Sequence, residues 1–426
     1  MTKILIDSGS FESKGWMAII IGLTKIIKAH IPDARIVILS HNIQKDEELG
    51  KYGFDLYQSP WIWTGPASSP STVIYYGILA VIDLLSSLAL RILQRPGIQI
   101  KPLIDDFDVI IHYNPDWYSE DERGTWRTIY PLIRLFILRT IFSDKPYATL
   151  PSSMGPFNSK IAHIVSKSVL NRLDLIALRI EESYNAICSL HLSRPQVVLV
   201  NDLAFFCDPA PMDRVKEIFH DEGVVRDDKP LFGFCPSKGP ISHAFNKSTS
   251  LDSRRENYIK SMVHIIDYTI DRFNAHACLI PHHEGDLELY QQIYELTIRK
   301  ERITYFRNEY FADELKGVIG SCDMFIGSLM HSTIASTSTG VPTIAIAYAD
   351  KFYGVIGDVM GQEDYIIDIR DKNRKEFLNE IEKKIDVLWL NRDQVRVELA
   401  KKAKVAREHA LPYGKFIEEL VRSKQK

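Results

Sequence analysis

The feature that most constrains this chain is a repeated alternation of short apolar runs with amphipathic stretches. The first forty residues contain the run KILID (Lys3–Asp7), an amphipathic stretch from Gly15 to Ala29, and the run RIVILS (Arg35–Ser40). Short apolar runs rich in β-branched residues predict strands, and apolar residues at helical spacing predict a helix between them. The chain is therefore predicted to open with a βαβ unit. The loop inside this unit lacks the GxGxxG spacing of a dinucleotide fingerprint.

The alternation continues along the chain in two series. The first series adds predicted strands at 108–112, 147–150, 175–178 and 197–200, and the second has them at 231–235, 277–280, 303–306, 324–327, 343–348 and 365–368. Between the series lies a stretch rich in proline and charge, which is typical of an interdomain connection. We therefore expect a first domain at 1–207, a linker at 208–230 and a second domain at 231–426 that ends in charged helices.

Strands that alternate with helices indicate an α/β protein with parallel, doubly wound sheets. Two such halves predict two Rossmann-like domains facing across a cleft, which is the GT-B architecture. In sheets of this kind, ligands bind beyond the carboxyl ends of the strands. Candidate site residues are therefore expected in the loops that follow the predicted strands.

Composition argues against several other classes of protein. The chain is 45% hydrophobic and 25% charged with a formal net charge of -3, and its basic residues form no stripe interleaved with aromatics. A nucleic-acid partner is therefore not expected. The five cysteines are far apart and form no CxxC pair, which argues against disulfides and against a zinc site. The first residues do not resemble a signal peptide, so we expect a cytoplasmic protein.

Two apolar segments raise the question of membrane contact. Val73–Leu93 is long and apolar enough to be considered as a membrane span, although Asp83 in its middle argues against spanning. Trp126–Thr140 places three arginines among large apolar residues, as interfacial helices often do. We expect both segments to be helices packed on a sheet. Peripheral membrane contact is the alternative.

A helix unusually rich in serine and threonine follows the predicted strand Met324–Gly327. It is predicted from about Met330 to Thr339, with Gly340 ending it. Serine and threonine compete for backbone hydrogen bonds and are weak helix formers. These residues therefore serve something other than helix stability. They either allow the helix to pack closely on its sheet or contribute to a binding site.

The first turn of this helix is the strongest candidate for an anion site. Its unpaired backbone amides and the positive end of its dipole favour a phosphate or carboxylate. The hydroxyls of Ser328, Ser332 and Thr333 would add donors. His331 lies in the same turn, where a bound anion would favour the protonated ring that acts as a general acid. The alternative is that His331 is structural.

The segment PHHEGD invites a test for a metal site, because His282, His283, Glu284 and Asp286 are close in sequence. Adjacent residues at a strand end point to opposite faces, so the two histidines cannot ligate one ion without a bend. We therefore expect no metal here. His282 or His283 is expected to contact a sugar or a donor substrate instead.

The run from Ala312 to Gly361 resembles the C-terminal signature of the polysaccharide pyruvyl transferase family. That signature has a strand ending in Gly, a motif ending in His, a small-residue helix, Gly-Val-Pro, and Tyr-x-x-Lys. The matching positions here are Gly327, His331, Gly340, Val341, Pro342, Tyr348 and Lys351. Three further segments, Leu150–Phe157, Leu175–Ile187 and Asn201–Phe206, resemble family segments in the same order.

The resemblance implies transfer of a pyruvyl group from phosphoenolpyruvate to two hydroxyls of a sugar, forming a ketal. It implies that His331 is the general acid, that Arg179 contacts the donor carboxylate and that Lys351 contacts the phosphate. No cofactor is implied, because phosphoenolpyruvate is a donor substrate. For Arg179 the alternative is an ion pair with Glu181 or Glu182. The partners are then phosphoenolpyruvate and a sugar or glycan acceptor.

This chain departs from the family pattern at two places. Many members have Arg where this chain has Leu329, and Lys238 is a candidate to replace that cation. Many members have a glycine-rich loop where this chain has HYNPDWYSED. Tyr113 and Trp117 in that loop suggest an aromatic acceptor site that stacks on sugar rings. The alternative is a hydrophobic plug beneath the loop.

Two other functions remain open from the sequence. One is a nucleotide-sugar glycosyltransferase on the same fold. An acidic residue about one turn into the Ser/Thr-rich helix would be expected to hold the ribose of its donor, and that helix has none. The other is a degenerate family member that no longer binds a donor.

Overall fold

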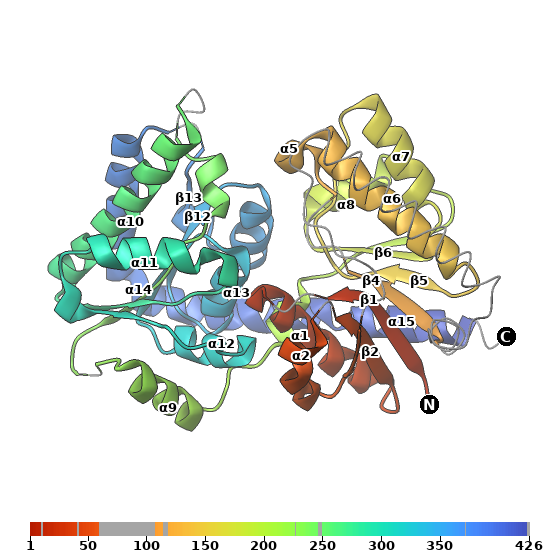
Figure 1. Ribbon diagram of the computed structural model, residues 1–426, viewed down its shortest axis with the longest axis horizontal. Helices are drawn as coiled ribbons and strands as arrows, with labels where there is room; N and C mark the ends of the chain where they lie inside the picture. Colours follow the sequence, from red (N-terminus) through yellow and green to blue (C-terminus); the bar gives the residue numbers. More distant parts are fainter. Residues whose placement is uncertain are drawn as a thin grey trace. The chain divides into compact units, whose positions relative to one another are not determined.

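The chain divides into two compact units (Figure 1). The computed structural model describes residues 1–9, 12–40, 42–58, 107–113, 118–225, 227–245, 249–370 and 372–423. The first unit comprises Met1–Phe11, Leu23–Asp202 and Ala410–Lys426, and the second comprises Glu12–Gly22 and Leu203–His409.

This division differs from the predicted boundaries (1–207, 208–230 and 231–426) in three segments. The predicted linker contains helix α9 (Met212–Glu222), which belongs to the second unit. Helix α1 (Lys14–His30) begins in the second unit and ends in the first, and α15 (Pro412–Ser423) returns to the first unit. Periodicity shows that a helix has an apolar face, but it does not show which sheet that face covers.

The first unit contains a parallel sheet with the order β3-β2-β1-β4-β5-β6-β7 among the described residues. Its strands are β1 (Lys3–Gly9), β2 (Arg35–Ser40), β3 (Asp55–Gln58), β4 (Val109–His112), β5 (Tyr147–Thr149), β6 (Leu175–Leu178) and β7 (Gln196–Leu199). Its other helices include α2 (Ile43–Asp46), α5 (Glu120–Arg123), α6 (Thr125–Ile141), α7 (Lys160–Leu170) and α8 (Glu181–Cys188).

The second unit repeats this arrangement with the order β10-β9-β8-β11-β12-β13. Its strands are β8 (Leu231–Cys235), β9 (His276–Leu279), β10 (Ile303–Tyr305), β11 (Met324–Gly327), β12 (Thr343–Ala347) and β13 (Ile366–Asp368). Its helices include α10 (Leu251–Phe273), α11 (Leu287–Leu296), α12 (Ala312–Gly320), α13 (Met330–Ser338) and α14 (Arg374–Ala410). The predicted parallel, doubly wound class is confirmed for both units.

Both strand orders reverse direction at one point, between β1 and β4 in the first unit and between β8 and β11 in the second. In an open α/β sheet, the loops at such a switch point diverge to opposite faces and leave a crevice at the carboxyl ends of the strands. These two places are therefore where each unit is most able to bind a ligand.

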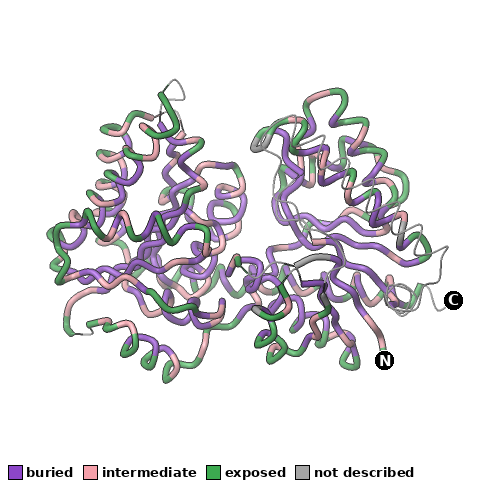
Figure 2. The backbone as a smooth tube through the Cα atoms, viewed as in Figure 1, coloured by how far each residue is buried: buried purple, intermediate pink, exposed green. Residues whose placement is uncertain are grey.

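The hydrophobic cores lie along the sheets, as the buried strands in Figure 2 show. Every residue of β4, β8, β11 and β12 is buried. Strands that are covered by helices on both faces need apolar side chains on both sides. This explains why their sequences read as continuous apolar runs rather than as alternating patterns.

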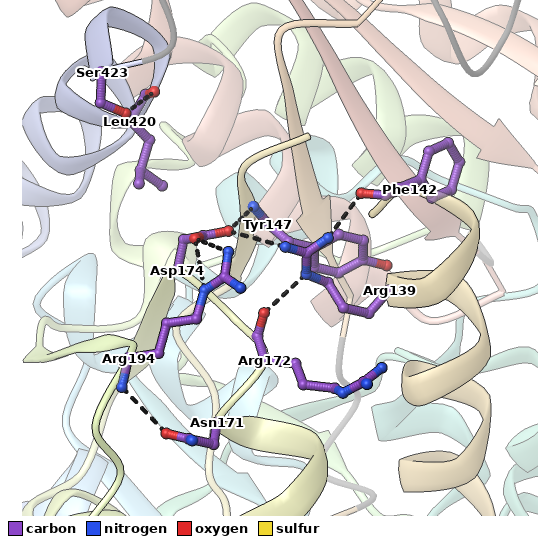
Figure 3. Close-up of polar contacts among 9 residues, drawn as sticks. All are labelled: Arg139, Phe142, Tyr147, Asn171, Arg172, Asp174, Arg194, Leu420 and Ser423. Carbon is purple, nitrogen blue, oxygen red and sulfur yellow. Dashed lines mark hydrogen bonds and ion pairs between the residues drawn. The ribbon is translucent and has the colours of Figure 1, made fainter. Parts of the chain in front are cut away.

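Helix α6 contains the arginine-rich apolar stretch for which membrane contact was the alternative. Its inner side is packed in the core of the first unit, with Leu132 and Leu135 fully buried. Arg139 is also buried. Its Nε donates to the carbonyl oxygen of Arg172 (2.8 Å) and its Nη1 to that of Phe142 (2.9 Å) (Figure 3). This arginine is therefore part of the fold.

A carboxylate completes the surroundings of Arg139. Its Nη2 lies 3.7 Å from Oδ2 of Asp174, which also accepts a hydrogen bond from the backbone N–H of Tyr147 (2.9 Å) (Figure 3). A buried guanidinium needs such partners to offset its loss of hydration. The second apolar segment, Val73–Leu93, lies outside the described residues. In the part of the chain that the structure describes, no helix combines the length and apolar character needed to cross a membrane.

Candidate active site

The switch point of the second unit brings together the loops that follow three of its strands. Ser237 and Lys238 follow β8, His282 and His283 follow β9, and His331 follows β11 in the first turn of α13. Strands β9, β8 and β11 are neighbours in the sheet, so these loops share its carboxyl edge. The structure therefore brings together the predicted residues Lys238, His282, His283 and His331.

The hydroxyls of the Ser/Thr-rich helix are occupied by protein oxygens. Ser332 Oγ donates to the carbonyl of Leu329 (2.7 Å), and Thr333 Oγ1 donates to the carbonyl of Met330 (2.7 Å). Both residues are fully buried. A hydroxyl has a single proton to donate, and here it goes to the helix's own backbone. This accounts for the composition of α13. Small side chains whose hydroxyls hydrogen-bond to nearby backbone carbonyls allow the helix to pack closely on its sheet.

Ser328 is also buried and acts as a structural bridge. Its backbone N–H donates to the carbonyl of Cys235 (3.0 Å), and its hydroxyl lies 3.0 Å from the hydroxyl of Tyr258 and 3.2 Å from that of Ser237. This network joins the ends of β8 and β11 to α10. In this structure, anion contacts from the start of α13 would therefore come from backbone amides rather than from the predicted hydroxyls.

His331 is half-buried and lies against the start of helix α1. A Cβ added to Gly15 would be 2.5 Å from Cγ of the His331 ring, which is closer than two carbon atoms can approach. Only glycine leaves room for the imidazole in this position. The backbone near the start of α1 is tied to the same site, because the N–H of Lys14 donates to the carbonyl of His282 (3.2 Å).

Lys14 brings a buried cation to this site. Only 6% of its side chain is exposed, and its Nζ lies 2.9 Å from Oε1 of Glu309, whose side chain is 57% exposed. The lysine thus has a charge partner on its solvent side. We refer to Lys14, His282, His283 and His331 as the basic cluster.

The surroundings of His282 in the basic cluster make protonation of its ring unfavourable. Burial, followed by the charges of His331, Lys14 and His283, lowers the pKa of His282 to about 3. The ring of His282 is therefore neutral at physiological pH. His283 accepts a hydrogen bond at Nδ1 from the N–H of Gly285 (2.9 Å), which leaves its Nε2 as the donor of the neutral ring. A bound anion would relieve the repulsion in this cluster.

The two lysines predicted to contact the donor lie along the same edge of the sheet. Lys238 donates its backbone N–H to Asp286 (3.0 Å), and its Nζ lies 3.7 Å from Oε2 of Glu288. Lys351 follows β12, with its Nζ 5.8 Å from the ring centroid of Tyr348. Tyr348 itself packs closely over Gly239, where an added Cβ would lie 2.7 Å from its ring. Tyr348 therefore lies between the loops that hold the two lysines.

Arg179 belongs to the first unit and directly follows β6, as predicted. Its Nη1 donates to Oδ2 of Asp202 (2.6 Å) and its Nε donates to the hydroxyl of Ser153 (3.1 Å). Both charged groups are buried. The carboxylate partner of Arg179 is thus Asp202, where the alternative interpretation had named Glu181 or Glu182. Those two glutamates occupy the first turn of α8, whereas Asp202 comes from the loop after the neighbouring strand β7.

The aromatic acceptor residues can be placed only in part. Tyr113 follows β4 and is half-buried, and its backbone N–H donates to Oδ1 of Asp7 (3.2 Å). Trp117 lies outside the described residues. Tyr118 is buried, and its hydroxyl lies 2.8 Å from Nε2 of His112.

Tyr118 and His112 are part of a closed polar network at the switch point of the first unit. Asp7, at the end of β1, accepts from Nδ1 of His112 (2.7 Å) and from the hydroxyl of Tyr147. All four side chains are at least 93% buried. This network ties β1, β4 and β5 together at the switch point of the first unit.

Sequence reasoning missed Lys14, Gly15 and Asp202. Lys14 and Gly15 lie in the loop and first turn that were searched only for a dinucleotide motif, and a lone lysine beside a glycine carries no pattern of its own. Asp202 lies in the segment Asn201–Phe206, which was noted only for its resemblance to a family motif. Its partnership with Arg179 depends on strand order, which no local pattern reveals.

Among the residues that the structure describes, no group of three or more His, Cys, Asp or Glu side chains is placed to hold a metal ion. The side chains of the PHHEGD segment have different surroundings and partners. His282 is buried in the basic cluster, whereas His283 caps the turn that follows. Asp286 points to Lys238, whose backbone N–H it accepts.

Solved structures similar to this chain share its fold at low sequence identity. UDP-GlcNAc 2-epimerase from Neisseria meningitidis, bound to UDP-GlcNAc, has a TM-score of 0.61 and 10% identity, with 99% of this chain and 100% of that chain covered. HepE from Anabaena, in complex with UDP, has a TM-score of 0.53 and 13% identity, with 99% of this chain and 100% of that chain covered. With the two strand orders, these similarities confirm the GT-B architecture.

The sequence comparisons are more specific. The amylovoran biosynthesis protein AmsJ from Erwinia amylovora is 21% identical over 226 residues, which cover 51% of this chain and 53% of that protein. The matched stretch thus spans about half the length of this curated relative. The profile of the polysaccharide pyruvyl transferase family matches residues 17–350, a range that includes the switch point of the second unit between β8 and β11. This chain belongs to the polysaccharide pyruvyl transferase family.

Proposed function

We propose that this protein transfers a pyruvyl group from phosphoenolpyruvate to two hydroxyls of a sugar in a glycan or a glycan precursor. The observation that carries the proposal is the basic cluster around His331, at the switch point of the second unit in a chain of this family. Phosphoenolpyruvate presents a carboxylate and a phosphate close together. A site lined by Lys14, three histidines and the amides that begin α13 suits such a donor.

The phosphate and the carboxylate need different partners. Lys14, His283 and the start of α13 are proposed to bind the phosphate, with Lys238 and Lys351 as further cations on the same edge. Arg179 is the proposed contact for the carboxylate, because a guanidinium matches a carboxylate with two parallel hydrogen bonds. In this structure Asp202 and Ser153 already use two of its nitrogens, so binding would require Arg179 to share or exchange these partners.

His331 is proposed to start the reaction as the general acid. Its proton goes to the methylene carbon of phosphoenolpyruvate, which becomes a methyl group and leaves the adjacent carbon electron-poor. A sugar hydroxyl adds to that carbon and returns its proton to the imidazole. The carbon–oxygen bond to phosphate then breaks, phosphate leaves with the electron pair, and a second hydroxyl closes the ketal while its proton goes to the phosphate.

The acceptor is proposed to lie against aromatic and imidazole groups. Tyr113 and Trp117 from the first unit are candidates to stack on a sugar ring, and His282 is a candidate hydrogen-bonding partner because its ring is neutral at physiological pH. A neutral imidazole can both donate and accept a hydrogen bond. This suits a hydroxyl that must lose its proton during the reaction.

A nucleotide-sugar glycosyltransferase is the second candidate, because similar structures were solved with UDP or UDP-GlcNAc bound. In that case the start of α13 would hold a diphosphate. Helix α13 contains no acidic residue that could hold a ribose, which favours the pyruvyl reaction.

The first experiment is a thermal-shift comparison of phosphoenolpyruvate with a panel of UDP- and GDP-sugars. A ligand that binds only the native state raises the apparent melting temperature by mass action. We expect phosphoenolpyruvate to stabilise the native protein and the His331→Gln variant alike, since this variant loses an acid and not the anion site. Stabilisation by a nucleotide sugar alone would replace the proposal with the glycosyltransferase.

The reaction itself is followed with phosphoenolpyruvate and sugar acceptors in deuterium oxide. Protonation by a group that exchanges with solvent places one deuterium in the methyl group of the ketal, which NMR detects. We expect the His331→Gln variant to form this product about 10²–10⁴-fold more slowly. Unchanged product formation would remove His331 from the chemistry. A chain that binds none of these ligands would be the degenerate family member.

A further inference from the structure

Two neighbouring helices of the first unit expose large apolar side chains to solvent. On α6 the exposed fractions are 59% for Trp126, 44% for Ile133 and 37% for Phe136. On α7 they are 44% for Ile161 and 56% for Ile164. Single exposed apolar residues are ordinary, but five large ones on an adjacent helix pair require an explanation.

Helical spacing places these residues on the outer sides of their helices. Trp126 and Ile133 are seven residues apart, and Phe136 follows three residues later, which keeps all three on one side of α6. Ile161 and Ile164 are likewise neighbours on α7. The two helices, orange and yellow in Figure 1, lie side by side. The guanidinium of Arg172, just beyond α7, lies 4.4 Å from the ring centroid of Phe136. We call this surface the α6–α7 face.

The charge of the α6–α7 face has a single sign. Helix α6 carries three arginines, helix α7 carries two lysines, and neither helix contains Asp or Glu. Arg127, Lys160 and Lys167 are exposed. Of the described acidic residues near the pair, Asp121 accepts from Asn158, Asp144 lies 3.9 Å from Lys145, and Asp174 accepts from Arg194.

Helix α14 of the second unit provides a contrast within the same chain. It also exposes apolar side chains, with 79% of Leu390 and 56% of Val397 accessible to solvent. Its charged residues, however, are of both signs along its whole length. Exposed apolar residues among mixed charges are an ordinary solvated helix surface. Exposed apolar residues surrounded only by cations are complementary to a surface with an apolar interior and an anionic outer layer.

We propose that the α6–α7 face docks the protein on an anionic membrane surface. Trp126 and the exposed isoleucines enter the boundary between headgroups and acyl chains, where tryptophan is favoured. Arg127, Lys160 and Lys167 lie level with the lipid phosphates. The proposal does not depend on the pyruvyl reaction, since it concerns where the first unit rests and not what the second unit binds.

The test is flotation of the full-length protein with vesicles on a density gradient. Vesicles of phosphatidylcholine alone are compared with vesicles that contain phosphatidylglycerol. We expect flotation only with the anionic vesicles, and we expect it to weaken as salt is added because the contact is partly electrostatic. No flotation with either vesicle, or equal flotation with both, would overturn the proposal.

Two variants separate the charge from the apolar part. Each lysine near an anionic surface is worth about fivefold in binding, so the double change Lys160→Gln with Lys167→Gln is expected to weaken binding about 25-fold. The change Ile164→Ser is expected to weaken binding to the anionic vesicles both with and without added salt. Both variants change exposed side chains, so their melting temperatures should equal that of the native protein.

Helix α14 supplies the matched controls. Leu390→Ser removes a more exposed apolar residue, and Lys401→Gln with Lys402→Gln removes two exposed lysines. Both should float as the native protein does. If the α6–α7 variants float as well as the native protein does, the assignment of this face is wrong. A dimer in solution that Ile164→Ser dissociates would assign the face to a second copy of the chain instead.

Discussion

Apart from the additional strand β7 in the first unit, the described strands of the two units have the same order, but their switch points are very different. In the first unit, Asp7 at the end of β1 and His112 at the end of β4 form a buried network with Tyr118 and Tyr147. In the second unit, the ends of β8 and β11 are joined by the small hydroxyl of Ser328, and the surrounding loops carry the basic cluster.

This difference shows that strand order places a possible binding site at the switch point but does not determine whether a ligand binds there. The carboxylate of Asp7 already accepts hydrogen bonds from three residues, so it has little capacity left for a ligand. The basic cluster instead gathers one lysine and three imidazoles, with the exposed carboxylate of Glu309 beside Lys14 and the buried carboxylate of Asp286 near His283. An excess of positive charge at a switch point is what an anionic donor requires. We therefore propose a structural role for the first switch point and donor binding for the second.

The largest expected effect is the loss of stability on changing Asp7 to Asn. The amide group would face donors that the carboxylate now accepts, and breaking a buried charge-assisted network costs about 3–5 kcal/mol. We expect hydrogen exchange to become faster in β4 and β5 while β8 and β11 keep their protection. Folded protein should still bind phosphoenolpyruvate, because the basic cluster is unchanged.

The control for this change is Asp55→Asn, on the same sheet. Asp55 pairs with Arg35 at 2.6 Å, but both side chains are substantially exposed, so water can replace the lost contact. If Asp7→Asn were no more damaging than Asp55→Asn, the first switch point would not be the rigid structural element described here.

The next effect is on turnover in Gly15→Ala. The added Cβ would lie 2.5 Å from the His331 ring, so the ring must move. A displacement of about 1 Å of a catalytic group can cost about 10²-fold in rate. We expect kcat to fall by this order while the fold remains intact. Gly50→Ala is the control, because nothing lies within 4 Å of its added Cβ, and an unaltered kcat in Gly15→Ala would show that the ring position is unimportant.

The basic cluster should also make stability depend on pH. The pKa of His282 is lowered from 6.5 to about 3, chiefly by burial. Between pH 6.5 and pH 3 the unfolded chain binds a proton that the folded chain does not. The free energy of unfolding should therefore fall as the pH drops through this window, by up to about 1.4 kcal/mol per pH unit. Above pH 6.5 His282 makes no such contribution.

Urea unfolding between pH 7 and pH 4 measures this dependence. His282→Asn should flatten the slope, because the group that must stay neutral is gone. His220→Asn should leave it unchanged, since 91% of the His220 side chain is exposed. Equal slopes in the native protein and in His282→Asn would contradict the description of the basic cluster as buried and crowded with charge.

The smallest effect is expected for Lys14→Met, which removes one cation and keeps the length of the side chain. We expect the KM for phosphoenolpyruvate to rise about tenfold with little change in kcat, because the lysine binds the donor in both the ground state and the transition state. Stabilisation by phosphoenolpyruvate in the thermal-shift assay should weaken in parallel. Lys216→Met, on the exposed surface of α9, is the control. An unchanged KM would place the phosphate elsewhere, with Lys238 and Lys351 as the next candidates.

Much of the fold could be predicted from the sequence, because it depends on local patterns. The strands from β1 to β13 that were predicted as apolar runs are present, since a strand buried on both faces has few alternatives to apolar residues. The position of His331 in the first turn of α13 was also predicted, because Gly327 and Gly340 bound that helix in the sequence. The purpose of the serines and threonines was left open, and the structure shows that their hydroxyls satisfy the helix itself.

The sequence by itself determined the α/β class, the two doubly wound halves, and the place of His331 after a strand. These follow from periodicity and turn residues, which act over a few neighbours. Only the tertiary structure decided that Lys14 and Gly15 lie against the loops of His282 and His331, that Arg179 pairs with Asp202, and that α15 returns to the first unit. These contacts join residues far apart in the chain. They depend on strand order and on which sheet each helix covers, and no local pattern encodes either.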